Sequence, residues 1–192
     1  MQNARLSVMV FAAVLIPIAS SAQEAAGPKG KTFTLSANML QAYQETQRNL
    51  SESAEKMPED AYGFRPTSEI KPFGQLVAHV ALAQFRMCAM LKGEADSHKD
   101  DKEETTRSKA DAIALLKASA TYCDPAVSAL TDPMMTELLD TGGFKAAKGL
   151  FPAEIVVHGA EMYGTMAVYL RLKGLVPPTT ERMNKMKASQ GN

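Results

Sequence analysis

The residues best suited to chemistry lie close together in the last quarter of the chain: His158, Glu161 and Met162. At helical spacing His158 falls in the middle of an apolar stripe, so its imidazole is expected to point inward. That stripe consists of Phe151, Ile155, Met162, Met166 and Tyr169. A buried imidazole needs partners for its ring nitrogens. Two interpretations stay open: a structural histidine bonded to a tyrosine or a backbone carbonyl, and a metal ligand.

Glu161 is the nearest carboxylate to His158 along the chain. On a helix its direction differs from that of His158 by about 60°, within reach of a shared metal ion. A divalent metal with an open position would stabilise a thiolate or hydroxide and support transfer or hydrolysis. The alternative is a polar residue at the edge of the stripe that pairs with a cation such as Arg171 or Arg65.

Methionine offers a different kind of site. His158, Met162 and Met166 recur at every fourth position, and the chain contains 12 methionines. Thioether and imidazole groups are ligands that suit Cu(I). Methionine at helical spacing also serves as adaptable core filling, which is the competing interpretation.

Four long helices are expected to position these residues. Their predicted ranges are 36–57, 72–92, 110–130 and 152–173, with Asp124-Pro125 producing either a kink or a new start in the third. A short helix is expected over 134–139. Because the sequence lacks sheet-forming segments, it predicts an all-α fold, an antiparallel four-helix bundle over 36–178. Residues 179–192 are assigned as a C-terminal tail.

The N-terminal segment is typical of an export signal. Arg5 precedes the apolar run Leu6–Ile18, and small residues follow at 20–22. We therefore expect a signal peptide over 1–22, a flexible tether over 23–35, and a periplasmic or extracellular protein. The apolar run is too short to span a bilayer, so no integral membrane segment is expected after cleavage.

Composition excludes some functions. The chain has 21 Lys plus Arg and 21 Asp plus Glu, so it has no net basic charge with which to attract nucleic acid. Its two cysteines, Cys88 and Cys123, fall at different heights if the second and third helices are antiparallel neighbours. The expected difference is roughly 15–20 Å, so a disulfide between them is not expected.

Three strings carry a resemblance to a known family: KMPEDAYGFRPTSEIKPFGQLVAHVALAQ, ATYCD and HGAEMYGTMAVYLRLKGLVPP. Together they resemble the DinB/YfiT-like superfamily from about Leu35 to Pro178. The resemblance implies a helical bundle, often a homodimer, in which three histidines hold a divalent metal, zinc or nickel in our expectation. Some members of the family are thiol-dependent transferases or isomerases.

Carried over by position, the resemblance assigns His79 and His158 as metal ligands that face each other. The third family histidine corresponds to position 162, which is Met162 here. We therefore expect an altered His, His, Met site in a module that binds a metal or an unidentified small molecule. The alternative is a metal-dependent hydrolase or thiol-dependent transferase that uses His79, His158 and Glu161.

Overall fold

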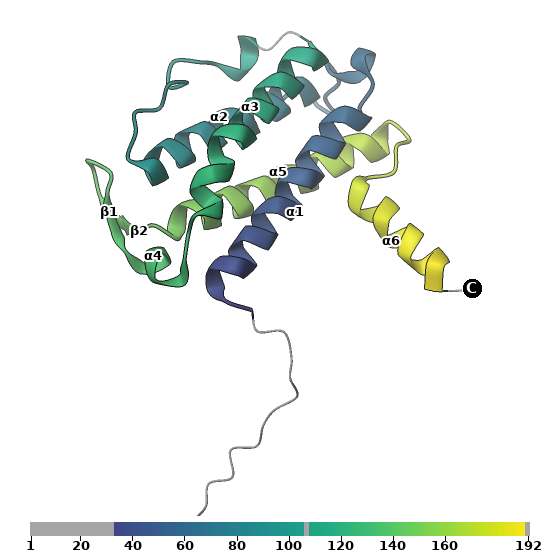
Figure 1. The fold of residues 1–192 in the computed structure, drawn as a ribbon. Helices are drawn as coiled ribbons and strands as arrows, with labels where there is room; N and C mark the ends of the chain where they lie inside the picture. The colour runs from purple at the N-terminus through teal and green to yellow at the C-terminus, as the bar shows by residue number, and fades with distance from the viewer. Residues whose placement is uncertain (1–32, 106–107, 191–192) are drawn as a thin grey trace, which may run out of the picture. The chain divides into compact units, whose positions relative to one another are not determined.

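Four long helices dominate the computed structural model, which describes residues 33–105 and 108–190 (Figure 1). They are α1 (Leu35–Lys56), α2 (Phe73–Lys92), α3 (Lys109–Ser128) and α5 (Leu150–Leu172). The all-α four-helix bundle is therefore confirmed, with helix boundaries within a few residues of those expected. The predicted signal peptide, most of the predicted tether and the last two residues of the chain lie outside the described residues.

Local sequence accounts for the ends of these helices. Thr34 caps α1 by accepting a hydrogen bond from the backbone N–H of Ala37, a role that serine and threonine commonly fill. Helix α2 begins directly after Pro72 and ends at Gly93, whose φ of 68° is a conformation that favours glycine. Helix α3 continues through Pro125 to Ser128, so Asp124-Pro125 does not start a new helix.

The order in which the helices pack defines the bundle. Residues from early α3, such as Leu116, share a buried cluster with Phe73 from early α2, while Cys123 from late α3 contacts Cys88 from late α2. Helix α3 therefore runs in the same direction as α2, contrary to our expectation. The bundle remains antiparallel in that α1 and α5 run against this pair. Residues 94–105, the described part of the connection that follows α2, run back along the bundle (Figure 1).

The change of direction overturns the prediction about the cysteines. Cys88 and Cys123 form a disulfide, with their Cα atoms 5.5 Å apart. Our estimate of height assumed that α3 begins where α2 ends. Since α3 instead begins beside the start of α2, both cysteines lie near the same end of the bundle, fully buried.

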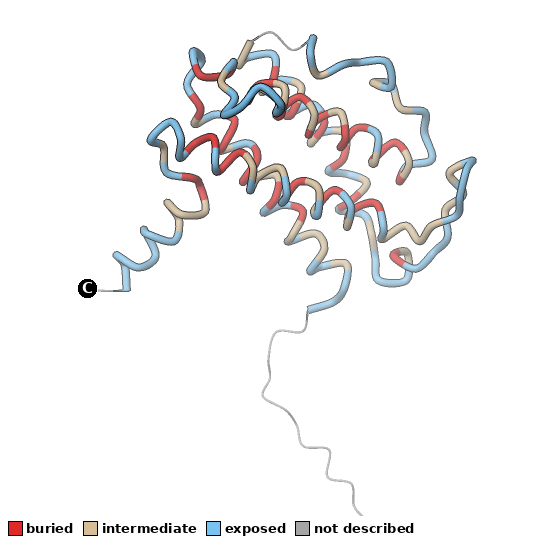
Figure 2. Tube along the Cα trace, turned by 180° about the vertical axis from the view of Figure 1, so that it is seen from behind, coloured by how far each residue is buried: buried red, intermediate tan, exposed pale blue. Residues whose placement is uncertain are grey.

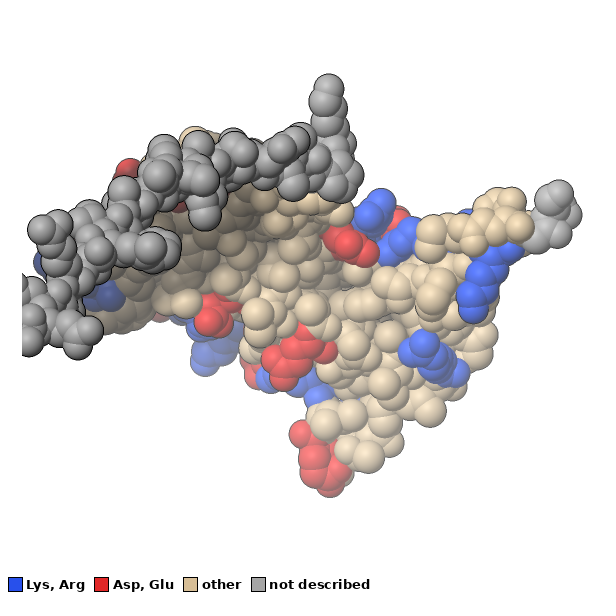
Figure 3. All heavy atoms as spheres, turned by 90° about the horizontal axis from the view of Figure 1, so that it is seen from below, with Lys and Arg blue, Asp and Glu red and all other residues tan. Residues whose placement is uncertain are grey.

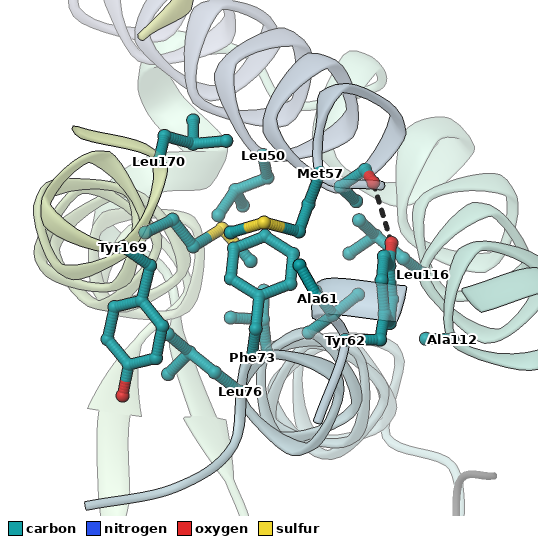
Figure 4. Close-up of a cluster of buried hydrophobic side chains, with 14 of the residues drawn as sticks. Leu50, Met57, Ala61, Tyr62, Phe73, Leu76, Ala112, Leu116, Tyr169 and Leu170 are labelled. Atoms are coloured by element: carbon teal, nitrogen blue, oxygen red, sulfur yellow. Dashed lines mark hydrogen bonds between the residues drawn. The ribbon is translucent and has the colours of Figure 1, made fainter. Parts of the chain in front are cut away.

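Buried side chains line the inner faces of the long helices, while α6 and the loops are largely exposed (Figure 2). Figure 4 shows one core cluster, in which the rings of Tyr62 and Phe73 meet edge to face. The Tyr62 hydroxyl donates a hydrogen bond to the backbone oxygen of Ala54 at 2.6 Å. Tyr62 and Phe64, from the connection between α1 and α2, pack against this end of the bundle.

Three smaller elements complete the described chain. Helix α4 (Asp132–Thr136) replaces the short helix expected over 134–139. Strands β1 (Leu138–Asp140) and β2 (Lys145–Ala147) pair as an antiparallel hairpin, although the sequence was expected to contain no sheet. Helix α6 (Pro178–Gln190) occupies most of the segment assigned as a tail. In the described part of the chain, no helix is long and apolar enough to span a membrane.

Candidate functional site

Helices α2 and α5 bring His79 and His158 together. Their ring centres are 5.2 Å apart, and the ring planes meet at 71°. Both residues lie between the buried core and the surface, and the side chain of His158 retains 22 % of its exposure against 34 % for His79. The structure thus pairs the two histidines that the sequence selected.

A carboxylate fixes the orientation of His79. Nδ1 of His79 lies 2.7 Å from Oε2 of Glu103, which comes from the connection between α2 and α3. Lys71 donates to the other carboxylate oxygen of Glu103. Burial opposes ionisation of Glu103, but the hydrogen bonds from Lys71 and His79 outweigh it and lower the pKa of the carboxyl group. Because Nδ1 is engaged, Nε2 of His79 is the ring nitrogen left to face a ligand.

His158 has the opposite balance of contacts. Its Nε2 is buried and has no hydrogen-bond partner among the described residues. Burial, followed by the charge of nearby His79, lowers the pKa of His158. A neutral imidazole is the form that binds metal ions. The interpretation of His158 as a structural residue bonded to a tyrosine or a backbone carbonyl gives no partner for Nε2 and is not supported.

Glu161 faces the other nitrogen of the same ring. Its Oε2 lies 4.0 Å from Nδ1 of His158, which is an ion-pair distance rather than a hydrogen bond, and its side chain is 69 % exposed. The cations proposed as its partners are occupied elsewhere: Arg65 contacts Ser68, and Arg171 contacts Thr180. Glu161 therefore lies on the Nδ1 side of the His158 ring and not next to Nε2.

The two methionines of α5 have different surroundings. Met162 is half-buried and lines a cavity of about 340 Å³ together with His79. Met166 is fully buried in the core cluster that contains Leu170 and Phe73. Of the two, Met162 is the thioether that shares a cavity with an imidazole, whereas Met166 serves as core filling.

His79 also lines a larger hollow on its other side. This cavity of about 470 Å³ lies beneath the charged connection between α2 and α3. Its walls carry both signs of charge, including Arg86, Lys102 and Asp101. Its size and polarity suit a small polar molecule. On the face shown in Figure 3, acidic and basic side chains are likewise interspersed rather than gathered in one patch.

Glu103 is the residue of this site that sequence reasoning missed. It lies in the strongly charged stretch between α2 and α3. Its side chain is only 14 % exposed, because the loop folds back over α2. No spacing in the sequence links Glu103 to His79, so no local pattern could have revealed the contact.

The donor set does not fit a centre with three nitrogen or oxygen ligands. Among residues 33–105 and 108–190, no group of three or more His, Cys, Asp or Glu side chains is arranged to hold a metal ion. The two cysteines are bonded to each other. Two imidazoles remain, and the third nearby donor is a thioether, which is not among the usual ligands of zinc.

Comparisons with known proteins place this arrangement in a family. The sequence profile of the DinB superfamily matches residues 42–161, which include both histidines. The chain belongs to the DinB superfamily. No curated protein matches the chain.

Solved DinB-like structures share the fold. A DinB-like protein from Bacillus cereus aligns with a TM-score of 0.62 at 17 % identity, covering 73 % of this chain and 93 % of that one. A DinB-like protein from Bacillus subtilis gives 0.58 at 20 % identity, covering 71 % and 92 %. These likenesses support the DinB fold and say nothing about what this DinB-superfamily protein binds.

Proposed function

We propose that this DinB-superfamily protein is an exported binding module with an altered metal centre formed by His79, His158 and Met162. The observation that carries the proposal is the buried Nε2 of His158, which has no partner among the described residues and lies beside a second imidazole. Leaving a buried polar nitrogen without a partner costs about 1–3 kcal/mol. A bound cation would remove that cost.

The separation of the two rings supports a shared ion. Bonds of about 2.1 Å from one metal to two imidazole nitrogens, at a near-tetrahedral angle, place the ring centres about 5 Å apart. The observed separation is 5.2 Å. The positions of the two carboxylates also support a shared ion, because metal-bound histidines usually direct their other nitrogen to a carboxylate or a carbonyl. Glu103 and Glu161 each face Nδ1, which leaves Nε2 of each ring for the ion.

The alternative function receives less support. A metal-dependent hydrolase or thiol-dependent transferase would use His79, His158 and Glu161 as ligands. Glu161 is exposed and faces Nδ1 of His158, so it does not lie next to the nitrogen that lacks a partner. The 470 Å³ cavity beside His79 favours a module that holds a small molecule near the centre over one that only stores a metal ion.

Elemental analysis of the purified protein tests the proposal after exposure to Zn²⁺, Ni²⁺ or Cu⁺ and removal of excess metal. We expect about one ion per chain in the wild type. His158→Ala should lose the ion while keeping its helical signal and unfolding midpoint. His98→Ala is the matched control, because the ring of His98 stacks on Phe85 and pairs with Asp101 rather than with His79 or His158, and the variant should keep the ion.

A wild type that retains none of these ions would overturn the proposal, as would equal retention by His158→Ala. Export is tested separately by N-terminal sequencing of the native protein, which should begin near residue 23. The Cys88–Cys123 disulfide supports export, since disulfides persist mainly in oxidising compartments.

A further inference from the structure

The third donor determines which metal this centre prefers. Met162 lies one helical turn after His158 on α5 and lines the same cavity as His79 from α2. Met162 and His79 therefore adjoin one cavity, and the ring of His158 lies 5.2 Å from that of His79. The set contains two neutral nitrogen donors and one thioether, and it brings no negative charge of its own to the ion.

Two imidazole nitrogens and one thioether sulfur favour soft cations over hard ones. Thioether sulfur is polarisable and binds soft ions such as Cu(I), while zinc and nickel sites draw on imidazole, carboxylate or thiolate ligands. The thiolates that would shift the balance towards zinc are absent from the site, because Cys88 and Cys123 are joined in a disulfide. The carboxylates of Glu103 and Glu161 face the Nδ1 atoms instead.

Met162 lies where the core meets a cavity. Its side chain is half-buried and packs against the apolar core cluster around Phe73 and Leu76. The cavity that it shares with His79 is lined by apolar residues such as Ile70 and by the polar side chains of Glu69, Lys71 and Thr165. The preference for a soft cation therefore follows from the donor atoms themselves and not from the polarity of the cavity.

We propose that His79, His158 and Met162 form a Cu(I) site, in which Met162 changes the metal preference from a divalent ion to monovalent copper. The inference rests on the proposed function and specifies its ligand. It also gives Met162 a role different from that of Met166, which lies one turn further along α5 and is fully buried in the core cluster.

Competition between the protein and a chromogenic Cu(I) chelator tests the proposal. The titration uses the whole chain, with Cu(I) maintained anaerobically by ascorbate. Met162→Leu keeps the volume and apolar character of the side chain and removes only the sulfur. We expect this change to weaken Cu(I) binding roughly tenfold or more. Zn²⁺ affinity and the unfolding midpoint should stay the same. Met166→Leu is the matched control and should bind Cu(I) like the wild type.

A second variant tests the same idea by gain of function. Met162→His supplies a third imidazole and should give a site that retains Zn²⁺ or Ni²⁺ after dialysis, where the wild type does not. X-ray absorption of the Cu(I)-loaded wild type should show a sulfur neighbour that disappears in Met162→Leu.

The outcomes separate the two proposals. Wild-type Cu(I) affinity in Met162→Leu, or no sulfur neighbour in the wild type, would refute the role of Met162. Retention of Zn²⁺ or Ni²⁺ without Cu(I) would also refute the inference but leave the metal-binding function intact. Retention of none of the three ions would reject both.

Discussion

Helix α5 contacts α1 and α2 in two different ways. Towards α1 it is closely packed, since a Cβ added at Gly159 would lie 2.5 Å from Cγ2 of Thr46. Towards α2 it places His158 opposite His79, beside a cavity and with a buried nitrogen left without a partner. The comparison shows how an apolar bundle can hold a polar site: close contacts on one side of the helix fix the backbone that positions reactive groups on the other.

Helix α2 also has one closely packed contact and one contact that contains the polar site. Its contact with α3 is buried and cross-linked by the Cys88–Cys123 disulfide. In the same contact the buried hydroxyl of Ser119 donates a hydrogen bond to the side-chain oxygen of Gln84 at 2.9 Å. Its contact with α5 contains the histidines. We call the α1–α5 and α2–α3 contacts the packed side of the bundle, and the α2–α5 contact around His79 and His158 the histidine seam.

Removing the disulfide should have the largest effect on stability. The bond closes a loop over a sequence separation of 35, for which chain entropy predicts a loss of about 3–4 kcal/mol in the free energy of unfolding. The double change Cys88→Ala and Cys123→Ala, compared with the oxidised wild type by urea unfolding, measures it. If the packed side and the histidine seam are independent, metal affinity in the folded variant stays the same. A matching loss of affinity would show that the cross-link positions His79, and the contrast would fail.

Two glycines in α5 allow the closely packed α1–α5 contact to be compared with an open position on the same helix. Gly159→Ala should lower the free energy of unfolding by about 1–3 kcal/mol, because the new methyl group overlaps Thr46 in a well-packed contact. Gly164→Ala is the matched control: its added Cβ meets nothing within 4 Å, so helix propensity should make the protein about 0.5–1 kcal/mol more stable. Thermal or urea unfolding measures both. Equal effects at the two positions would mean that the α1–α5 contact adapts easily and does not hold His158 in place.

The fold was predictable where it depends on local signals. Pro72 and Gly93 mark the ends of α2, and apolar stripes define the faces that pack. The direction of α3, in contrast, could not be predicted from local signals. Residues 94–108 can span roughly 50 Å when extended, longer than the approximately 30 Å of α2, so the connection can cross the bundle before α3 begins. Assuming that the third helix runs antiparallel to the second placed Cys123 at the wrong height and led to the wrong prediction about the disulfide.

The site was predictable only where its residues lie on regular helices. His79, His158 and Met162 lie on regular helices, where spacing and the family resemblance specify position. Glu103 lies in the crossing connection, and its contact with His79 depends on the path of that loop. The roles of Met162 and Met166 could not be separated by periodicity, because residues four apart share a face. The core cluster around Leu170 separates them, since it encloses Met166 completely and Met162 only partly.

Acid should weaken the contact between α4 and the start of α1, with the smallest effect of the series. Asp132 holds the start of α1 by accepting hydrogen bonds from the backbone N–H groups of Leu35 and Ser36 and from the Ser36 hydroxyl. These bonds, the one from the hydroxyl first, lower the pKa of Asp132 below its ordinary value of 3.8. Its ionised form is thus favoured by folding. The resulting stability is present above the unfolded pKa and is lost as pH falls through the folded pKa.

Urea midpoints of the wild type and Asp132→Asn, measured between pH 6 and pH 2.5, test this contribution. The variant should be less stable than the wild type at pH 6, and the difference should shrink as the pH falls below about 4. Asp100→Asn, in the exposed loop after α2, makes the same change in net charge and corrects for it. A difference that persists unchanged at pH 2.5 would show that the hydrogen-bond geometry of Asp132, rather than its charge, stabilises this end. Because Asp132 on α4 contacts the start of α1 and lies outside the histidine seam, its substitution should leave metal affinity at pH 7 unchanged. That result would separate the acid sensitivity of the α1–α4 contact from the chemistry of His79 and His158.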